Sequence, residues 1–302
     1  MGYDYQSPWF REALKVEDKL EINQLKSKES ADICIVGGGY TGLWTALKIK
    51  EKNASTKIII IERDLCGSGA SGRNGGCMIP LSSKFTAMKK IVGAKDAIRM
   101  VKASEEALNE IKKFCEVNNL DAKIRINGIV YSATNNKHRG GFDNLLKDLN
   151  DNNINNWERL SEEKIQKLTG SNRNIDGYFS PIGGSLQPAL LARGLKKIAE
   201  KKGIKIFERS AMSSYDNNTM ITVHTAHGSI ECKKLVLAIN AWTPSFLSFL
   251  SRSVILVSSD MIISEPINNE LEKLNLNNGL VVLDSNLFTH YYRSTPDGRI
   301  ML

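Results

Sequence analysis

The stretch ADICIVGGGYTGL, residues 31–43, constrains the fold more than any other part of the sequence. A short apolar strand, DICIV, runs directly into Gly37, Gly39 and Gly42, which are spaced G-x-G-x-x-G, and a helical stretch follows. The first glycine permits a tight turn, the second lets a pyrophosphate approach the backbone, and the third lets the helix lie close to the sheet. The sequence therefore predicts the start of a Rossmann-like dinucleotide-binding domain.

The segment STKIIIIERD supplies the second strand of this unit. Its unbroken run Ile58–Ile61 is typical of a strand buried on both faces of a parallel sheet. Glu62 ends this strand about twenty positions after Gly42, where a carboxylate can accept hydrogen bonds from an adenosine ribose. The glycine turn and Glu62 together predict a cofactor that carries adenosine.

The glycine-rich stretch SGASGRNGGC, residues 68–77, follows soon after. Glycine costs about 0.5–1 kcal/mol relative to alanine inside regular structure, so this stretch is a poor start for a helix. It offers instead a row of backbone N–H groups beside Ser71, Arg73 and Asn74, which can hold the second side of a pyrophosphate or border a flat ring. A simple NAD site has no need for such a loop. The alternative is a mobile surface loop.

The order of patterns predicts an α/β fold in which two domains interleave. We expect a Rossmann-like dinucleotide-binding domain with a parallel sheet at 30–83 and 185–245, and a second domain with a mixed or antiparallel sheet at 84–184 and 246–302. A ligand would lie where they meet.

Several local predictions accompany this division. Residues 1–30 have the composition of a polar lead-in, residues 84–118 have helical spacing, and Pro188 opens an amphipathic helix. Strands are expected in KIRINGIVYSAT, SVILVSSDMIIS and HYYRSTPDGRIML.

Composition narrows the function classes. Five cysteines, without a CxxC pair, speak against a disulfide framework or a zinc site and fit a reducing cytosol. No stretch has the length and apolarity of a signal peptide or a membrane span. The net charge of +8 comes from lysines interspersed with glutamates, which indicates a solvated surface rather than a nucleic-acid site. The histidines lack ligand spacing, so no metal is expected.

At GGGYTGL, IER and GASGRNGG, in this order and spacing, the sequence resembles the amine-oxidising flavoprotein family that includes D-amino acid oxidase, glycine oxidase and sarcosine oxidase. The closer likeness is to the bacterial branch typified by gamma-glutamylputrescine oxidoreductase. It continues through GGSLQPALLARGLKKIA, ERSAM, LVLAINAW and YYRSTPDGRIML, so it runs from about residue 8 to the end.

The resemblance implies an FAD-dependent oxidoreductase that removes a hydride from the carbon bearing an amine and delivers it to flavin N5. The resulting imine would be hydrolysed, and no catalytic side chain is identified because the flavin carries the difficult electronics. The resemblance makes residues 30–83 and 185–245 the FAD-binding domain and residues 84–184 and 246–302 the substrate domain. Tyr292 and Arg293 are the candidates for contact with a substrate, since a guanidinium suits a carboxylate. The expected cofactor contacts are Gly37, Gly39, Tyr40, Thr41, Gly42, Glu62, Arg63, Ala70, Ser71, Arg73, Asn74, Gly75, Gly76, Met212, Ala238 and Asn240.

Two departures from the family pattern stand out. Ile239 replaces a small residue before NAW and is expected to crowd the backbone near the cofactor. Relatives of this branch continue well past PDGR, so we expect a chain truncated at its carboxyl end or complemented by a second chain. Cys77, beside the loop, is interpreted as a small buried thiol rather than a point of flavin attachment.

Three functions remain open from the sequence. The first is the cytoplasmic, FAD-dependent amine or amino acid oxidoreductase that the resemblance implies. The second is an NAD-binding dehydrogenase, which the SGRNGG loop disfavours. The third is a catalytically idle fragment that binds the adenine half of FAD, or one half of a split enzyme.

Overall fold

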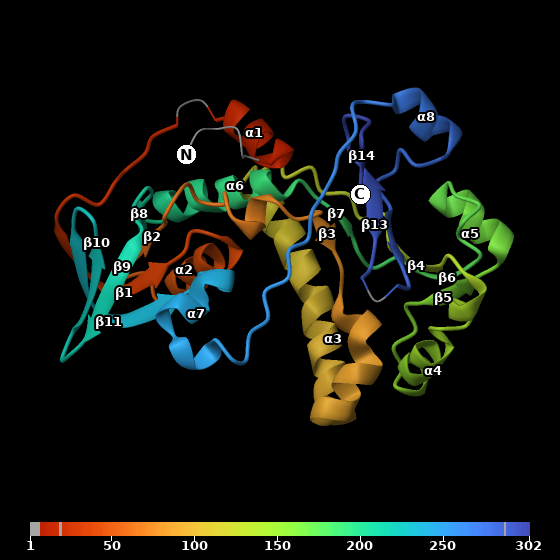
Figure 1. The fold of residues 1–302 in the computed structure, drawn as a ribbon, viewed down its shortest axis with the longest axis horizontal. Coiled ribbons are helices and arrows are strands. Elements are labelled where there is room, and N and C mark those ends of the chain that lie inside the picture. Colours follow the sequence, from red (N-terminus) through yellow and green to blue (C-terminus); the bar gives the residue numbers. More distant parts are fainter. Residues whose placement is uncertain (1–6, 18–19, 287) are drawn as a thin grey trace. The chain divides into compact units, whose positions relative to one another are not determined.

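The computed structural model describes residues 7–17, 20–286 and 288–302. These residues form two compact units (Figure 1). Unit 1 comprises the described residues of Met1–Asn74 and Pro188–Asp260, and unit 2 comprises those of Gly75–Gln187 and Met261–Leu302. The chain therefore passes from one unit to the other three times. The assignment of a cofactor role and a substrate role to the interleaved domains stays a prediction.

Unit 1 is built on a six-stranded sheet with the order β8-β2-β1-β11-β10-β9. The first four of these strands pair in parallel, and β9 and β10 continue the sheet in antiparallel pairing. Segments far apart in the sequence thus lie side by side, as the colours of Figure 1 show. Its strands are β1 (Lys28–Val36), β2 (Ile58–Ile61), β8 (Lys205–Phe207), β9 (Met212–Asn217), β10 (Ile221–Thr225) and β11 (Ser229–Leu237).

The register aligns the carboxyl ends of the parallel strands. Val36 pairs with Ile61 and Leu237, and Ile61 pairs with Phe207. Residues that follow these strands therefore gather at one edge of the sheet, which is where ligands bind in open α/β sheets. The confirmed α/β fold brings the predicted glycine turn and Glu62 to this edge.

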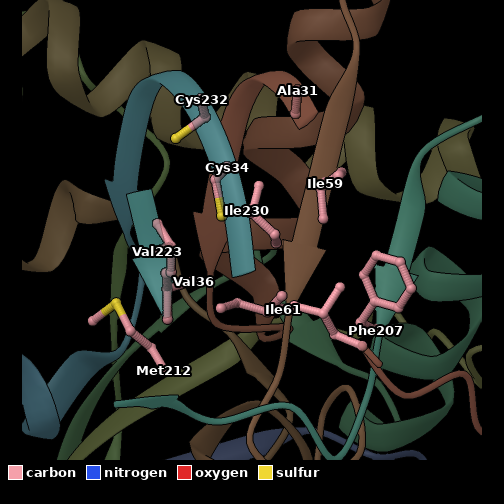
Figure 2. Close-up of a cluster of buried hydrophobic side chains, with 11 residues drawn as sticks. Ala31, Cys34, Val36, Ile59, Ile61, Phe207, Met212, Val223, Ile230 and Cys232 are labelled. Carbon is pink, nitrogen blue, oxygen red and sulfur yellow. The ribbon is translucent and has the colours of Figure 1, made fainter. Parts of the chain in front are cut away.

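The core of unit 1 confirms that β2 is buried on both faces, since all four of its isoleucines are at most 2% exposed. Figure 2 shows apolar side chains of β1, β2, β10 and β11 gathered with Phe207 and Met212. Burying such side chains stabilises the sheet by about 1.5–3 kcal/mol each.

The helices of unit 1 include one that the sequence interpretation missed. Helix α1 (Pro8–Lys15) lies within the stretch expected to be a polar lead-in, and it buries Trp9, Phe10 and Ala13. Its amino terminus is capped by Ser7, whose hydroxyl accepts from the Phe10 N–H, and Pro8 takes the first helical position. The other helices are α2 (Tyr40–Lys52), α6 (Pro188–Lys201) and α7 (Thr243–Phe246), with 3-10 turns at Ala70–Gly72, Asn240–Trp242 and Ser248–Leu250.

Helix α6 begins at Pro188 as predicted and packs against both α1 and α2. Its apolar face is buried and includes Leu191 and Leu195.

Unit 2 contains a second six-stranded sheet with the order β14-β13-β12-β4-β6-β5. Only β12 and β4 pair in parallel, so the sheet is mixed, as expected. Strands β3 and β7 form a separate two-stranded sheet. The strands are β3 (Cys77–Met78), β4 (Ile129–Ala133), β5 (Glu158–Leu160), β6 (Asp176–Ser180), β7 (Gly184–Ser185), β12 (Val281–Asp284), β13 (Tyr291–Ser294) and β14 (Ile300–Met301).

The longest helix of unit 2 confirms the helical pattern predicted for 84–118. Helix α3 (Phe85–Val117) is interrupted at Gly93, which has φ +80°. The remaining helices are α4 (Asp143–Asp151), α5 (Glu162–Thr169) and α8 (Asn268–Lys273), with 3-10 turns at Leu81–Lys84 and Asn136–His138. None of the helices described is long and apolar enough to cross a membrane.

The strand predicted for SVILVSSDMIIS, residues 253–264, is wrong. The structure assigns no strand there, and only Ile263 forms an isolated bridge, with Met301. Ile255 is 89% exposed and Val257 is 74% exposed, so the apolar run lies on the surface. A β-prone run becomes a strand only where another strand pairs with it. Only the end of this run does so, through backbone hydrogen bonds of Ile262 and Ser264 with residues 300–302, and among the residues described no strand pairs with 253–261.

Candidate cofactor-binding site

The glycine turn between β1 and α2 requires glycine at both ends. Gly37 has φ +112°, and a Cβ there would lie 2.4 Å from the carbonyl oxygen of Ala238. A Cβ on Gly42 would lie 2.0 Å from the carbonyl oxygen of Gly37. The backbone is therefore packed against itself too tightly for any side chain, and the amino terminus of α2 is brought up to the sheet edge.

Gly39 is the N-cap of α2 and brings no side chain to the helix terminus. A Cβ on Gly39 would lie 2.8 Å from Ser71 Oγ, which accepts a hydrogen bond from the Tyr40 N–H at 2.9 Å. The Tyr40 hydroxyl in turn donates to the Pro188 carbonyl at 2.7 Å. A helix amino terminus whose N-cap carries no side chain suits an anionic phosphate.

Glu62 lies at the same edge, at the carboxyl end of β2. Its carboxylate accepts from the Gly38 N–H at 2.7 Å and from the Asp64 N–H at 2.9 Å. Burial raises the pKa of Glu62, and these two hydrogen bonds oppose that shift by favouring the ionised form. The carboxylate is thus directed at the glycine turn, as the sequence spacing predicted.

The loop of residues 68–74 is docked on the glycine turn rather than free of it. Besides the Ser71 contact, the Gly67 N–H donates to the Gly38 carbonyl at 3.0 Å. Within the loop, Arg73 Nε donates to the Ser68 carbonyl at 2.7 Å and Asn74 Nδ2 donates to the Ala70 carbonyl at 3.0 Å. The loop and the turn therefore form one hydrogen-bonded backbone assembly, which we call the cradle (residues 37–42, 62 and 66–74).

The remaining candidates of unit 1 lie at the end of β11 and at the start of β9. The Ala238 N–H donates to the Val36 carbonyl at 2.8 Å, and Asn240 opens a 3-10 turn with φ +46°. Met212 begins β9 and is buried in the core. Ile239, expected to crowd the backbone, places Cγ2 3.5 Å from the position that a Gly37 Cβ would take, an ordinary contact distance.

Arg63 has a partner that sequence reasoning did not find. Its guanidinium lies 4.3 Å from the centroid of the Trp242 ring, a cation–π arrangement. Trp242 is 45% exposed. The signal available in the sequence was the NAW motif itself, from which the sequence analysis took Asn240 as a cofactor contact but assigned no contact to Trp242.

Gly75 and Gly76 belong to unit 2, where Gly75 contacts β13 and Gly76 binds Leu186. A Cβ on Gly75 would lie 2.4 Å from Cε2 of Tyr291, and the Gly75 carbonyl accepts from Arg293 Nε at 2.6 Å. The Gly76 carbonyl accepts from the Leu186 N–H at 2.8 Å. Tyr291 escaped the sequence analysis, although the alternation of side chains along a strand places it on the same face as Arg293.

The two predicted substrate contacts lie on opposite faces of β13. Arg293 is 2% exposed, and its Nη2 donates to the Leu186 carbonyl at 2.8 Å. The Tyr292 hydroxyl donates to the Thr169 carbonyl at 2.8 Å and accepts from Asn174 Nδ2 at 3.1 Å. Tyr292 lines a largely apolar cavity of about 480 Å³ within unit 2. The structure therefore does not bring the two side chains together, and their substrate role stays a prediction.

Cys77, in β3, is partly buried. Burial raises the pKa of its thiol to about 11, and its Sγ lies 3.7 Å from the Gly75 carbonyl oxygen. The thiol is thus only partly buried where the sequence predicted a buried one, and its raised pKa keeps it protonated at neutral pH.

The parallel sheet with a glycine turn and an acidic residue at its carboxyl edge defines a Rossmann-type dinucleotide-binding protein. Residues 32–302 match the family described as FAD dependent oxidoreductase (DAO), and the chain belongs to that family. This confirms the resemblance noted at the glycine-rich motifs and FAD as the cofactor that it implied.

Relatives of known name agree with this membership. The chain is 29% identical over 280 residues to the probable oxidoreductase OrdL of Haemophilus influenzae, covering 90% of this chain and 64% of that protein. It is 26% identical over 290 residues to gamma-glutamylputrescine oxidoreductase of Escherichia coli, covering 93% and 66%. The chain thus spans about two thirds of the length of these relatives.

Solved structures share the fold at low sequence identity. Glycine oxidase from Geobacillus kaustophilus superposes with a TM-score of 0.68 at 16% identity, covering 90% of this chain and 70% of that one. L-amino acid deaminase from Proteus vulgaris superposes with a TM-score of 0.67 at 18% identity, covering 94% and 62%.

Proposed function

We propose that this chain binds FAD through the cradle of unit 1 and acts as an oxidoreductase on the C–N bond of an amine or amino acid. The observation that carries the proposal is the hydrogen-bonded assembly of the glycine turn, Glu62 and the loop of residues 68–74. The relatives named for gamma-glutamylputrescine and glycine support this class of substrate.

The cradle fits the cofactor on its own geometry. At Gly37 and Gly42 a Cβ would fill the space in which the turn closes, and Gly39 keeps the amino terminus of α2 open to a pyrophosphate. Glu62 would accept hydrogen bonds from the adenosine ribose, and the loop with Ser71 would border the second side of the pyrophosphate. Met212, Ala238 and Asn240 remain proposed contacts at the rim of this site.

FAD, when bound, supplies the acceptor at flavin N5 for a hydride from the carbon that bears the amine, and water then hydrolyses the imine. The chain's own contribution is to fix the cofactor and to place the C–H bond of the substrate. Within unit 2, Tyr292 offers a hydroxyl held by Thr169 and Asn174 beside an apolar cavity, which suits contact with a substrate side chain. Arg293 donates to backbone carbonyls, so its first role is to hold the loop exit at Gly75.

The experiment that tests the proposal is the visible absorption spectrum of the purified chain before and after addition of FAD. We compare Gly39→Ala, whose Cβ would meet Ser71 Oγ at 2.8 Å, with Lys52→Ala, at an exposed position at the far end of the same helix. Flavin bands that survive desalting in the wild type and in Lys52→Ala but not in Gly39→Ala support the proposed cradle. A colourless wild type that also ignores added FAD contradicts it.

A second step distinguishes an oxidoreductase from a chain that only binds the cofactor. The FAD-loaded protein is mixed without oxygen with gamma-glutamylated diamines, glycine, proline and other amino acids. Bleaching of the flavin band by one of these classes supports amine oxidation. Retained flavin that no amine bleaches favours the idle fragment or the need for a complementing chain.

A further inference from the structure

A buried ion pair lies beside the cradle at the same edge of the sheet. Glu208 follows β8 directly and is 1% exposed, and Arg193, on α6, is 4% exposed. Arg193 Nη1 donates to Glu208 Oε1 at 2.7 Å. Burying two charges is costly unless each has further hydrogen bonds, so the partners of this pair indicate what it holds in place.

Both members of the pair hold the backbone of Cys66. The Cys66 N–H donates to Glu208 Oε1 at 2.6 Å, and Arg193 Nη1 donates to the Cys66 carbonyl at 3.2 Å. The sequence contains a signal for this arrangement, because Glu-Arg follows β8 in IFER as it follows β2 in IIER. Glu62 and Glu208 thus end neighbouring parallel strands, and one holds the turn while the other holds the loop.

Cys66 connects the ion pair to the glycine turn. A Cβ on Gly38 would lie 2.3 Å from Cys66 Sγ, so the thiol fills the space beside the centre of the turn. The next residue, Gly67, donates its N–H to the Gly38 carbonyl at 3.0 Å. A displacement of Cys66 would therefore move the backbone of Gly38 and, through it, the opening of α2.

Other contacts fix the orientation of the pair. Arg193 Nη2 donates to Glu17 Oε2 at 2.9 Å, and Arg193 Nε donates to Glu17 Oε1, so Glu17 binds the outer edge of the guanidinium. The Glu208 N–H donates to the Asn23 carbonyl at 2.9 Å, and Lys196 Nζ lies 4.0 Å from Glu208 Oε2. Glu17 is 23% exposed, and within the part of the chain that the structure describes its carboxylate binds Arg193 and not the cradle. A variant at Glu17 therefore tests the stability of the network without removing a contact to Cys66.

We propose that Arg193 and Glu208 are positioning residues for FAD, which fix Cys66 and so set the spacing between the glycine turn and the glycine-rich loop. This inference rests on the proposed function. A cofactor site demands placement to within about 0.5 Å, and supporting residues that lock the contacting backbone provide it.

The test compares three variants of the full chain, Arg193→Met, Glu208→Gln and the control Glu17→Gln. Dissociation constants for FAD and for ADP, which lacks the flavin, are measured by calorimetry, and the melting temperature is measured without ligand. We expect Arg193→Met to weaken both ligands about tenfold or more, and Glu208→Gln about threefold or more, as loss of supporting residues does at other sites. Glu17→Gln is expected to lower the melting temperature while both constants stay within about twofold.

Each possible outcome supports or contradicts the positioning role of Arg193 and Glu208. Equal FAD constants in the wild type and in all folded variants would overturn the positioning role while leaving FAD binding intact. An equal loss of affinity in Glu17→Gln would overturn it too, since the effect would then follow stability alone. If Arg193→Met does not fold, Glu208→Gln carries the decision because it keeps the shape and an acceptor for the Cys66 N–H. A wild type that binds neither ligand would overturn the proposed function and this inference together.

Discussion

Unit 1 and unit 2 each bury an arginine, and the two arginines are held in different ways. Arg193 of unit 1 is bound by the carboxylates of Glu17 and Glu208, whereas Arg293 of unit 2 donates to the carbonyls of Gly75 and Leu186. Burial lowers the pKa of both guanidinium groups, but around Arg193 the two carboxylates reverse the shift and raise it. The charged pair of Arg193 and Glu208 thus fixes the start of the glycine-rich loop at Cys66. Hydrogen bonds from Arg293 to backbone carbonyls fix the end of this loop at Gly75.

The two units differ also in how much of each candidate site can be predicted from short sequence motifs. In unit 1 the chemistry is carried by backbone groups and by residues that directly follow strands, so short motifs describe it. In unit 2 the candidate contacts depend on which face of β13 a side chain takes and on partners far away in the sequence. Four experiments, taken from the largest expected effect to the smallest, test this difference.

The largest effect is expected from Gly42→Ala in unit 1, paired with Gly184→Ala in unit 2. Each introduced Cβ would lie 2.0 Å from a carbonyl oxygen, that of Gly37 or that of Arg125. Overpacking of this kind costs about 1–3 kcal/mol, so denaturant titration should show both variants destabilised. Only Gly42→Ala should also weaken FAD binding by about tenfold or more, because it moves the turn itself. Loss of FAD binding by folded Gly184→Ala would contradict the proposal that unit 1 binds FAD and unit 2 contacts the substrate.

Arg293→Met should destabilise unit 2 without affecting the ion pairs of Arg193 with Glu17 and Glu208 in unit 1. It leaves the Gly75 and Leu186 carbonyls buried without these donors, which costs about 1–3 kcal/mol for a buried unsatisfied group. Urea unfolding of the variant measures the loss, with Arg293→Lys as the control that keeps the charge but not the fork. Unchanged stability together with a raised KM for a carboxylate-bearing amine would instead favour the predicted substrate role.

Glu62→Gln should remove a pH dependence of FAD binding. The pKa of Glu62 is raised by burial, so its carboxylate ionises above the ordinary glutamate range, and only the ionised form accepts freely from a ribose hydroxyl. FAD affinity of the wild type should therefore rise with pH through that raised pKa and then level off, while the Gln variant stays flat. At neutral pH the variant should bind about fivefold more weakly, measured by fluorescence titration.

The raised pKa of Glu62 affects the stability of the fold in the opposite direction, since stability falls where FAD affinity rises with pH. Without cofactor, the contribution of Glu62 to stability is present below its unfolded pKa and is lost as pH rises through the folded pKa. This loss of stability should be absent in Glu62→Gln, so the melting temperature of the variant should change less with pH. That measurement is the matched control. An identical pH profile of FAD affinity in the wild type and the variant would show that Glu62 does not bind the cofactor.

The smallest effect is expected from Trp242→Leu. It removes the half-exposed cation–π contact with Arg63, worth about 0.5–1 kcal/mol, and should change the stability of unit 1 by no more than that. Phe249→Leu, at a side chain 73% exposed, serves as the control and should be neutral in thermal unfolding. A larger loss of FAD affinity than of stability in Trp242→Leu would give this pair a part in the cofactor site.

Much of unit 1 could be predicted because its determinants are local. The four isoleucines of β2 and the proline that opens α6 indicated their elements directly, and the structure confirms both. Helix α1 was missed because its apolar residues Trp9, Phe10 and Ala13 are few and lie among charges, so only the packing against α6 shows their burial. The strand expected at 253–264 failed for the converse reason, since β-propensity does not supply a pairing partner.

The sequence by itself determined the glycine turn, the buried parallel strands and the acidic residue that ends β2, because steric limits on the backbone and side-chain periodicity act over a few residues. Tertiary structure alone decided which groups hold the cradle together. Ser71 reaches Tyr40 across 31 positions, Glu208 reaches Cys66 across 142, and Arg293 reaches Gly75 across 218. Hydrogen bonds at such separations are directional and short-ranged, so they exist only once the whole chain has brought their donors and acceptors within about 3 Å.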